Sequence, residues 1–272
     1  PEPFDPMEQA FHRLHANNGG AAPAGAQLAR VYPLRPELLA VTQAWQAEGD
    51  SGWQVAAKGS PESIASLCRL DAERVAALHR QVDEMAASGL RVLGVAAACH
   101  DGARLPETPQ EFVFDFLGLV GLEDPLRGSV PGAVRECREA GIRVVMITGD
   151  YPQTARAIAA RAGIDADSVL TGAEIRAMDD AKLRAAVRQT SVFARIMPEQ
   201  KLQLVQALKA AGEVVAMTGD GVNDAPALKA ADIGIAMGGR GTDVAREASS
   251  LVLLDDDFGS IVRTVRLGRR IY

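Results

Sequence analysis

The sequence is poor in cysteine and in aromatic residues, and it has no long apolar run. Its 272 residues include three cysteines and 4% aromatic residues. Cys68, Cys99 and Cys137 lie far apart and form no Cys-x-x-Cys pair, which excludes a disulfide scaffold and argues against a cysteine zinc site. No stretch of about 18 apolar residues occurs, so we expect no membrane-spanning helix here. The formal charge of −6 argues against a nucleic-acid partner.

The residues that are present predict a globular protein of two domains. Hydrophobic residues make up 47% of the chain and charged residues 24%, which is ordinary for a soluble domain. The pattern changes near residue 124, so we predict domains at 1–123 and 124–272. The first has apolar runs at 53–57, 91–98 and 112–122 between Gly- and Pro-rich turns, and a helical pattern at 72–88. These features predict an α+β module with an antiparallel sheet.

The second domain alternates short apolar strands with helices. Such a pattern is typical of an α/β fold, a doubly wound parallel sheet covered on both faces. We expect helices at 130–140, 152–162 and 198–211, and strands at 142–147, 191–195, 213–217, 233–237 and 251–254. Ligands of these sheets bind at the carboxyl ends of the strands.

Polar residues follow three of these predicted strands. The strand ends are followed in turn by Thr148-Gly149-Asp150, by Lys201 in the first turn of a helix, and by Asp220 with Asp224. A Thr hydroxyl and Gly-rich amides suit a phosphoryl oxygen, and a Lys supplies a point charge for it. Two carboxylates suit Mg²⁺. Each motif alone is weak evidence for such a site, since Thr-Gly-Asp is commonly a simple turn. Their occurrence together, in this order at successive strand ends, favours a phosphoryl-transfer site.

Several segments resemble the P-type cation-transporting ATPases, which are members of the haloacid dehalogenase superfamily. The segment MTGDGVNDAPAL at 217–228 is similar to the hinge motif of that family at every position. Further similar segments are GTDVAREA at 241–248, the tail at 255–272, DPLR at 124–127, MITGD at 146–150, KGSPE at 58–62, GLRVL at 89–93 and DPME at 5–8. The resemblance therefore extends over nearly the whole chain.

The resemblance implies roles for individual residues and a haloacid-dehalogenase-like fold for the second domain. It implies that Asp220 binds Mg²⁺ and that ATP lies between the two domains. Residues implied at the phosphoryl group are Thr148, Lys201, Asn223 and Asp224, and those implied at the nucleotide are Gly149, Asp150, Arg195, Glu8, Lys58, Gly59 and Arg91. Solvated surface roles for Lys58 and Arg91 stay open, as does a helix first-turn role for Glu8.

The sequence departs from the family pattern in two places. The Asp-Lys-Thr-Gly-Thr motif, whose Asp accepts the phosphoryl group, is absent. We expect it upstream of Pro1, on the central strand of the sheet, so the sheet should be interrupted and this chain alone should be inactive. Leu34 also stands where the family usually has an aromatic ring for adenine. This predicts weak nucleotide binding unless Tyr32 supplies the ring.

The leading hypothesis is therefore the nucleotide-binding and phosphorylation domains of a P-type pump at the cytoplasmic face of a membrane. Its expected partners are ATP, an upstream segment with the phosphorylated Asp, membrane helices and an actuator domain. No His precedes a Pro, which favours the calcium-type group over heavy-metal pumps, and Arg far outnumbers Lys, as in GC-rich bacteria. Two alternatives stay open: a soluble phosphatase with 1–123 as its cap, and a nucleotide-sensing module without activity.

Overall fold

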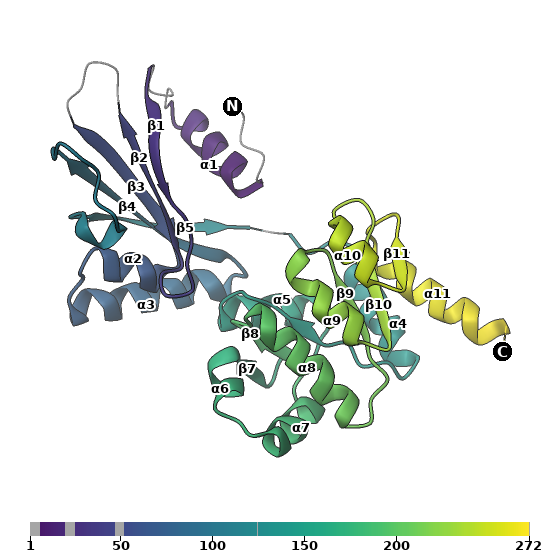
Figure 1. Ribbon diagram of the computed structural model, residues 1–272. Helices are drawn as coiled ribbons and strands as arrows, with labels where there is room; N and C mark the ends of the chain where they lie inside the picture. The colour runs from purple at the N-terminus through teal and green to yellow at the C-terminus, as the bar shows by residue number, and fades with distance from the viewer. Residues whose placement is uncertain (1–5, 20–24, 47–51, 124, 272) are drawn as a thin grey trace. The chain divides into compact units, whose positions relative to one another are not determined.

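The computed structural model describes residues 6–19, 25–46, 52–123 and 125–271. The chain divides into two compact units, Pro1–Asp124 and Pro125–Tyr272, and each is described by itself (Figure 1). Three residues of the family-like segments, Asp5, Asp124 and Tyr272, lie outside the described residues. Among the helices of the described ranges, none combines the length and apolar character needed to cross a membrane.

The first unit is built on one antiparallel sheet of five strands in the order β1-β2-β3-β4-β5. The strands are β1 Gln27–Tyr32, β2 Ala40–Gln46, β3 Trp53–Gly59, β4 Arg91–His100 and β5 Asp115–Leu122. The helices are α1 Pro6–Asn17, α2 Pro61–Leu67 and α3 Ala72–Ala87, with a short 3-10 helix η1 at Pro109–Glu111. The predicted antiparallel α+β module is confirmed.

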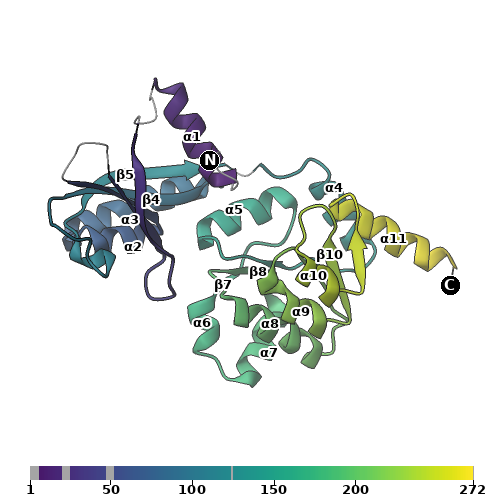
Figure 2. The ribbon, with the colours of Figure 1, turned by 45° about the horizontal axis from the view of Figure 1, so that its top comes forward.

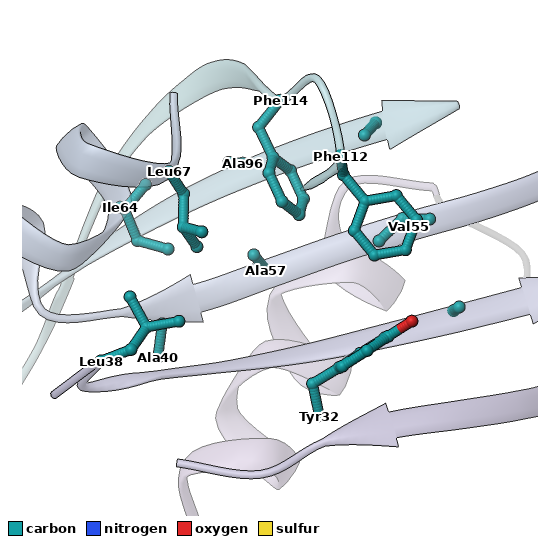
Figure 3. Close-up of a cluster of buried hydrophobic side chains, with 12 residues drawn as sticks. Tyr32, Leu38, Ala40, Val55, Ala57, Ile64, Leu67, Ala96, Phe112 and Phe114 are labelled. Atoms are coloured by element: carbon teal, nitrogen blue, oxygen red, sulfur yellow. The ribbon is translucent and has the colours of Figure 1, made fainter. Parts of the chain in front are cut away.

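One face of this sheet carries the core of the first unit. Val55 and Ala57 of β3 point to this face and are each 2% exposed. They pack with Ile64 and Leu67 of α2, and Figure 3 shows these side chains on one side of the strands. Because side chains alternate along a strand, the neighbouring Lys58 points to the opposite face. The sheet therefore has one face sealed by α2 and one face that can present functional groups.

The second unit contains parallel strands, as predicted, but in two separate sheets. These are β6-β8-β7 and β11-β10-β9. The strands are β6 Met146–Ile147, β7 Val169–Thr171, β8 Val192–Ala194, β9 Ala216–Gly219, β10 Ile233–Met237 and β11 Leu251–Leu253. The helices are α4 Val130–Glu139, α5 Pro152–Ala162, α6 Gly172–Arg176, α7 Asp180–Gln189, α8 Pro198–Ala210, α9 Ala225–Ala230, α10 Asp243–Ala248 and α11 Phe258–Ile271, with the 3-10 helix η2 at Val222–Asp224.

Helices cover both faces of β8, as a doubly wound sheet requires. Val192 and Ala194 pack on Ala155 and Ala159 of α5, whereas Phe193 between them packs on Leu204 of α8. Figure 2 shows α5 and α8 on opposite sides of this strand. The predicted α/β class, a doubly wound arrangement with helices on both faces, is thereby confirmed.

The expected interruption of the parallel sheet lies between β6 and β9. Both are edge strands, and within the described ranges they do not pair with each other. They nevertheless share one hydrophobic cluster, because Ile147 of β6 and Met217 of β9 both pack around Leu204 of α8. The two sheets are thus held on one core with their facing edges unpaired.

Two predicted strands differ most from the observed ones. The strand expected at 142–147 is only Met146–Ile147, since β8, its one partner in the described part of the chain, pairs with it only there. The strand expected at 213–217 is Ala216–Gly219. It begins later because the Val215 N–H donates to the side-chain carboxylate of Asp232 and not to the backbone of a neighbouring strand.

Candidate functional site

The first part of the site lies at the end of β6 in the second unit. The Thr148 hydroxyl donates to Asp150 Oδ2 at 2.9 Å and accepts from the Asp150 N–H at 3.1 Å. This turn leaves Gly149 exposed between the two residues. Backbone bonds then join the turn to the end of β8: the Arg195 N–H donates to Asp150 O at 3.0 Å, and the Ile196 N–H donates to Thr148 O at 3.0 Å. The predicted residues Thr148, Asp150 and Arg195 therefore lie together.

Arg195 is held in an unusual backbone conformation. Its φ is +53°, in the left-handed region that costs an ordinary L-residue about 1–2 kcal/mol. The guanidinium lies over the Tyr151 ring, 5.2 Å from the ring centroid, within the range of a cation–π contact. A strained backbone at a strand end is often found at functional sites, and here the cation lies over Tyr151, the residue directly after the Thr148–Asp150 turn.

The second part of the site is the ion pair between Lys201 of α8 and Asp224 of η2. Lys201 Nζ lies 2.6 Å from Asp224 Oδ1, and the two side chains are 22% and 9% exposed. The start of α8 is fixed by the buried Gln200, which accepts from the Met197 N–H at 3.0 Å and donates to Gly172 O at 2.6 Å. Lys201 is therefore placed by a rigid helix start.

The two carboxylates of the predicted metal pair have different surroundings. Asp224 Oδ2 accepts the N–H groups of Asp220 at 3.3 Å and of Gly221 at 3.1 Å, so both oxygens of Asp224 already have donors. Asp224 can lie this close to the backbone because residue 219 is a glycine. A Cβ at Gly219 would lie only 2.5 Å from the Asp224 Cβ. The Asp220 side chain is exposed, and within the described ranges no hydrogen bond or ion pair to its carboxylate is found. Asn223 is exposed in η2 between them.

This donor set fits a magnesium ion at Asp220. Within the part of the chain that the structure describes, no three His, Cys, Asp or Glu side chains form a protein metal cage. Mg²⁺ does not need such a cage, because it binds through one or two carboxylates and completes its shell with water and phosphate oxygens. Asp220 offers an exposed carboxylate, and its backbone N–H bonds to Asp224, the partner of Lys201. One such carboxylate supplies that minimum.

A separate group of predicted residues meets on the open face of the first unit. Lys58 of β3 has Val41 of β2 and Val95 of β4 as cross-strand neighbours. Its ammonium forms an ion pair with the Glu8 carboxylate of α1, and it lies 4.9 Å from the centroid of the Phe11 ring. Glu8 and Lys58 are therefore brought together from positions fifty residues apart.

Gly59 directly follows Lys58 on β3, whereas Arg91 lies further from this group, at the start of β4. A Cβ at Gly59 would lie 2.3 Å from the backbone oxygen of Leu39, so only glycine fits beside Lys58. Arg91 is exposed at the start of β4 and lies on the same face as Val95, four residues further along the strand. Phe11 was not predicted from the sequence. Its position three residues after Glu8 on one helix face is the signal that could have pointed to it.

Tyr32 does not take the place of the missing adenine ring. It is 5% exposed, its hydroxyl donates to Pro106 O at 2.6 Å, and its ring packs edge-to-face on Phe112 at 5.7 Å (Figure 3). Burial raises the pKa of its hydroxyl, although the nearby Arg30 opposes this. Leu34 is 57% exposed. The ring of Tyr32 is therefore part of the core and has no free face for a ligand.

Comparison with known proteins gives a consistent picture. A family model for haloacid dehalogenase-like hydrolases matches residues 7–232. "Cation-transporting ATPase pma1" of Synechocystis is 44% identical over 273 residues, covering 93% of this chain and 30% of that protein. "Calcium-transporting ATPase 1" of Bacillus cereus is 47% identical over 190 residues, covering 69% and 21%. "Sodium/potassium exporting P-type ATPase cta3" of Schizosaccharomyces pombe is 40% identical over 267 residues, covering 89% and 25%.

These relatives confirm the resemblance to the P-type cation-transporting ATPases that the motifs predicted. The chain spans between 21% and 30% of the length of these three curated relatives. The roles of the individual site residues stay predictions.

Proposed function

Because the chain belongs to the haloacid dehalogenase-like hydrolase family, we propose that it comprises the nucleotide-binding and phosphorylation domains of a P-type cation pump. Residues 1–123 bind ATP, and residues 124–272 hold the phosphoryl group and Mg²⁺. In the whole protein, hydrolysis of ATP through a phosphorylated aspartate drives cation transport. The observation that carries this proposal is the Lys201–Asp224 ion pair at 2.6 Å, in which Asp224 also accepts the backbone N–H of Asp220.

The residues of the second unit take distinct roles in this proposal. Phosphoryl transfer depends mostly on positioning and on charge stabilisation. Lys201 supplies positive charge to the phosphoryl oxygens, and the Thr148 hydroxyl, the Gly149 N–H and the Asn223 amide donate hydrogen bonds to them. Asp220 provides the carboxylate ligand for Mg²⁺, which neutralises developing charge on the phosphoryl group. Asp224, with donors on both oxygens, holds Lys201 and the 220–221 backbone and so acts as a positioning residue.

The acceptor aspartate comes, in this proposal, from a strand outside these 272 residues that pairs between β6 and β9. The unpaired edges of these two strands on a shared core support it. A metal-ligating Asp220 is a poor nucleophile while it binds the ion, so it cannot replace that aspartate. We therefore expect the 272-residue chain alone to form no phosphoenzyme.

The transported ion and the membrane setting are proposed by likeness alone. A bacterial relative is named a calcium-transporting ATPase, and we propose a calcium-type pump, more plausible here than a heavy-metal pump. Membrane helices and an actuator domain of the same protein are its proposed partners, at the cytoplasmic face of a membrane.

The test is formation of an acid-stable phosphoenzyme. A longer protein that includes the Asp-Lys-Thr-Gly-Thr segment is incubated with Mg²⁺ and ATP labelled at the γ-phosphate, then acid-quenched. We expect a hydroxylamine-sensitive adduct that Asp220→Asn and Lys201→Ala abolish. Lys209→Ala, which removes a lysine of α8 paired with Asp232 instead, is the matched control and should leave the adduct unchanged. No adduct in the longer protein contradicts the proposal, and hydrolysis of simple phosphomonoesters instead points to a soluble phosphatase.

A further inference from the structure

The open face of the first unit's sheet carries a cation next to an aromatic ring. The opposite face is closed by α2, and Figure 1 shows α1 on the other side of the sheet from α2 and α3. Lys58 projects from β3 toward α1, where Glu8 and Phe11 meet it. Val41 and Val95 flank Lys58 on the neighbouring strands and are half-buried. The open face around Lys58 is therefore an apolar surface that carries one ammonium group and one aromatic ring.

The ring and the carboxylate come from one face of α1. Glu8 and Phe11 are three residues apart, so they lie side by side on the helix. Glu8 is 40% exposed and Lys58 is 22% exposed, while Phe11 is half-buried. The ion pair thus fixes the ammonium against the ring, and part of all three side chains stays accessible to a ligand.

Other aromatic rings of the described first unit are less well placed for a ligand at Lys58. Tyr32, Phe112 and Phe114 are core residues of the opposite face (Figure 3). Trp45 lies on the open face of β2, but it is four residues along the strand from Val41, the neighbour of Lys58. Four residues of strand span about 13 Å. Phe11 is the ring that contacts Lys58 among the described residues.

We infer that Phe11 supplies the surface on which the base of a bound nucleoside triphosphate stacks, with Lys58 beside it. The inference rests on the proposed nucleotide-binding role of the first unit, and it adds the residue that recognises the base. A flat apolar ring next to an ammonium suits a ligand that combines an aromatic base with negative charge, because the ring stacks on the base and the cation attracts the phosphates. Phe11 thereby provides the aromatic surface for the base that neither Leu34 nor the buried Tyr32 provides.

The test separates base recognition from phosphate recognition by titration calorimetry of the 272-residue chain. The two ligands are a non-hydrolysable Mg·ATP analogue and inorganic tripolyphosphate, which has no base. We expect Phe11→Leu to weaken binding of the ATP analogue about 3- to 10-fold and to leave tripolyphosphate binding unchanged. Phe11→Trp keeps an aromatic surface, so it should bind the analogue at least as tightly as the parent chain, with quenching of the new tryptophan.

Two control variants sharpen the result. Leu14→Ala alters an exposed residue on the same helix and should change neither affinity. Trp45→Leu removes the other ring of the open face and should also leave binding unchanged. The inference is overturned if Phe11→Leu binds the ATP analogue as tightly as the parent chain. It is also overturned if Trp45→Leu loses affinity for the analogue and Phe11→Leu does not. In both cases nucleotide binding by the first unit still stands. If the parent chain binds no ATP analogue at millimolar concentration, the proposed function of the first unit fails as well.

Discussion

The two units differ in how their sheets are assembled. In the first unit each strand pairs with the next along the chain, and the five strands form one antiparallel sheet. In the second unit the strands are parallel, helices connect the strands that pair, and β6 pairs with β8 and not with β7, the next strand along the chain. An antiparallel sheet made of local pairings can form from one continuous segment. A parallel sheet can lack a strand that another segment supplies, and the β6–β9 interruption is such a place.

The core of the first unit should respond most strongly to the truncation of a buried side chain. Phe112 is 2% exposed and contacts the rings of Tyr32 and Phe114. We expect Phe112→Ala to lower the free energy of unfolding by about 3–5 kcal/mol, because it leaves a cavity in a close-packed core. Urea unfolding followed by tryptophan fluorescence measures this, since both tryptophans, Trp45 and Trp53, lie in the first unit. Leu117→Ala, at a site 66% exposed, is the control and should change the value little.

The site of the second unit should depend on its ion pair for stability as well. Asp224→Ala removes the partner of Lys201 and the acceptor of the Asp220 and Gly221 N–H groups. We expect the free energy of unfolding to fall by about 1.5–3 kcal/mol, the range for a hydrogen bond to a charged group. Urea unfolding followed by circular dichroism measures it. Asp243→Ala is the control, because it removes a surface carboxylate that is 88% exposed and paired with Arg246. An equal loss of unfolding free energy in this control would contradict the structural role of Asp224.

Two buried threonines, one in each unit, should change the free energy of unfolding in opposite directions when each is replaced by valine. The Thr42 hydroxyl in the first unit is buried and has no hydrogen-bond partner among the described residues, whereas Thr154 in the second unit is equally buried and does interact. We expect Thr42→Val to raise the free energy of unfolding by about 1 kcal/mol, because an unsatisfied polar group is removed, and Thr154→Val to lower it. The urea midpoints of the two variants measure both effects; a shift in the same direction for both would refute the comparison.

The smallest effect concerns acid stability of the second unit. The Gly239 N–H, followed by that of Arg240, holds the pKa of Asp256 below its usual range. A lowered pKa in the folded state stabilises the fold above the unfolded pKa and loses this effect as pH falls through the folded value. We therefore expect the melting temperature to fall between pH 5 and pH 3, and to fall less in Asp256→Asn. Asn is the suitable replacement because residue 256 has a φ of +51°, which Asn tolerates.

Much of the fold follows from the sequence pattern, and the exceptions have physical causes. The helix at 152–162 and the strand at 233–237 match the predicted bounds, because Pro and Gly mark the helix ends and the strand is continuously apolar. Strand β1 gave no such signal, since it is an edge strand with five of its six residues exposed. The length of β6 depends on pairing with distant strands, which a local pattern does not contain.

The candidate site, like the fold, follows only in part from the sequence pattern. Thr148, Lys201 and Asp220 were predicted because each follows an apolar strand, and the fold of a parallel sheet brings such positions to one edge. The two carboxylates of the Asp-x-x-x-Asp pair are alike in sequence, and only the structure separates Asp224, with donors on both oxygens, from the open Asp220. The spacing of Phe11 from Glu8 places both side chains on one face of α1, but the contact of Phe11 with Lys58 joins distant segments and is seen only in the structure.

The most direct measurement of the central claim is amide hydrogen exchange at Ile147 in β6. The N–H groups of Met146 and Thr148 bond to β8, so the Ile147 N–H points to the unpaired edge. We predict rapid exchange of this amide in the 272-residue chain and strong protection in a longer protein whose Asp-Lys-Thr-Gly-Thr strand fills the β6–β9 interruption. An Ile147 amide that exchanges equally fast in a longer protein that forms the phosphoenzyme would contradict the claim that the acceptor strand lies there.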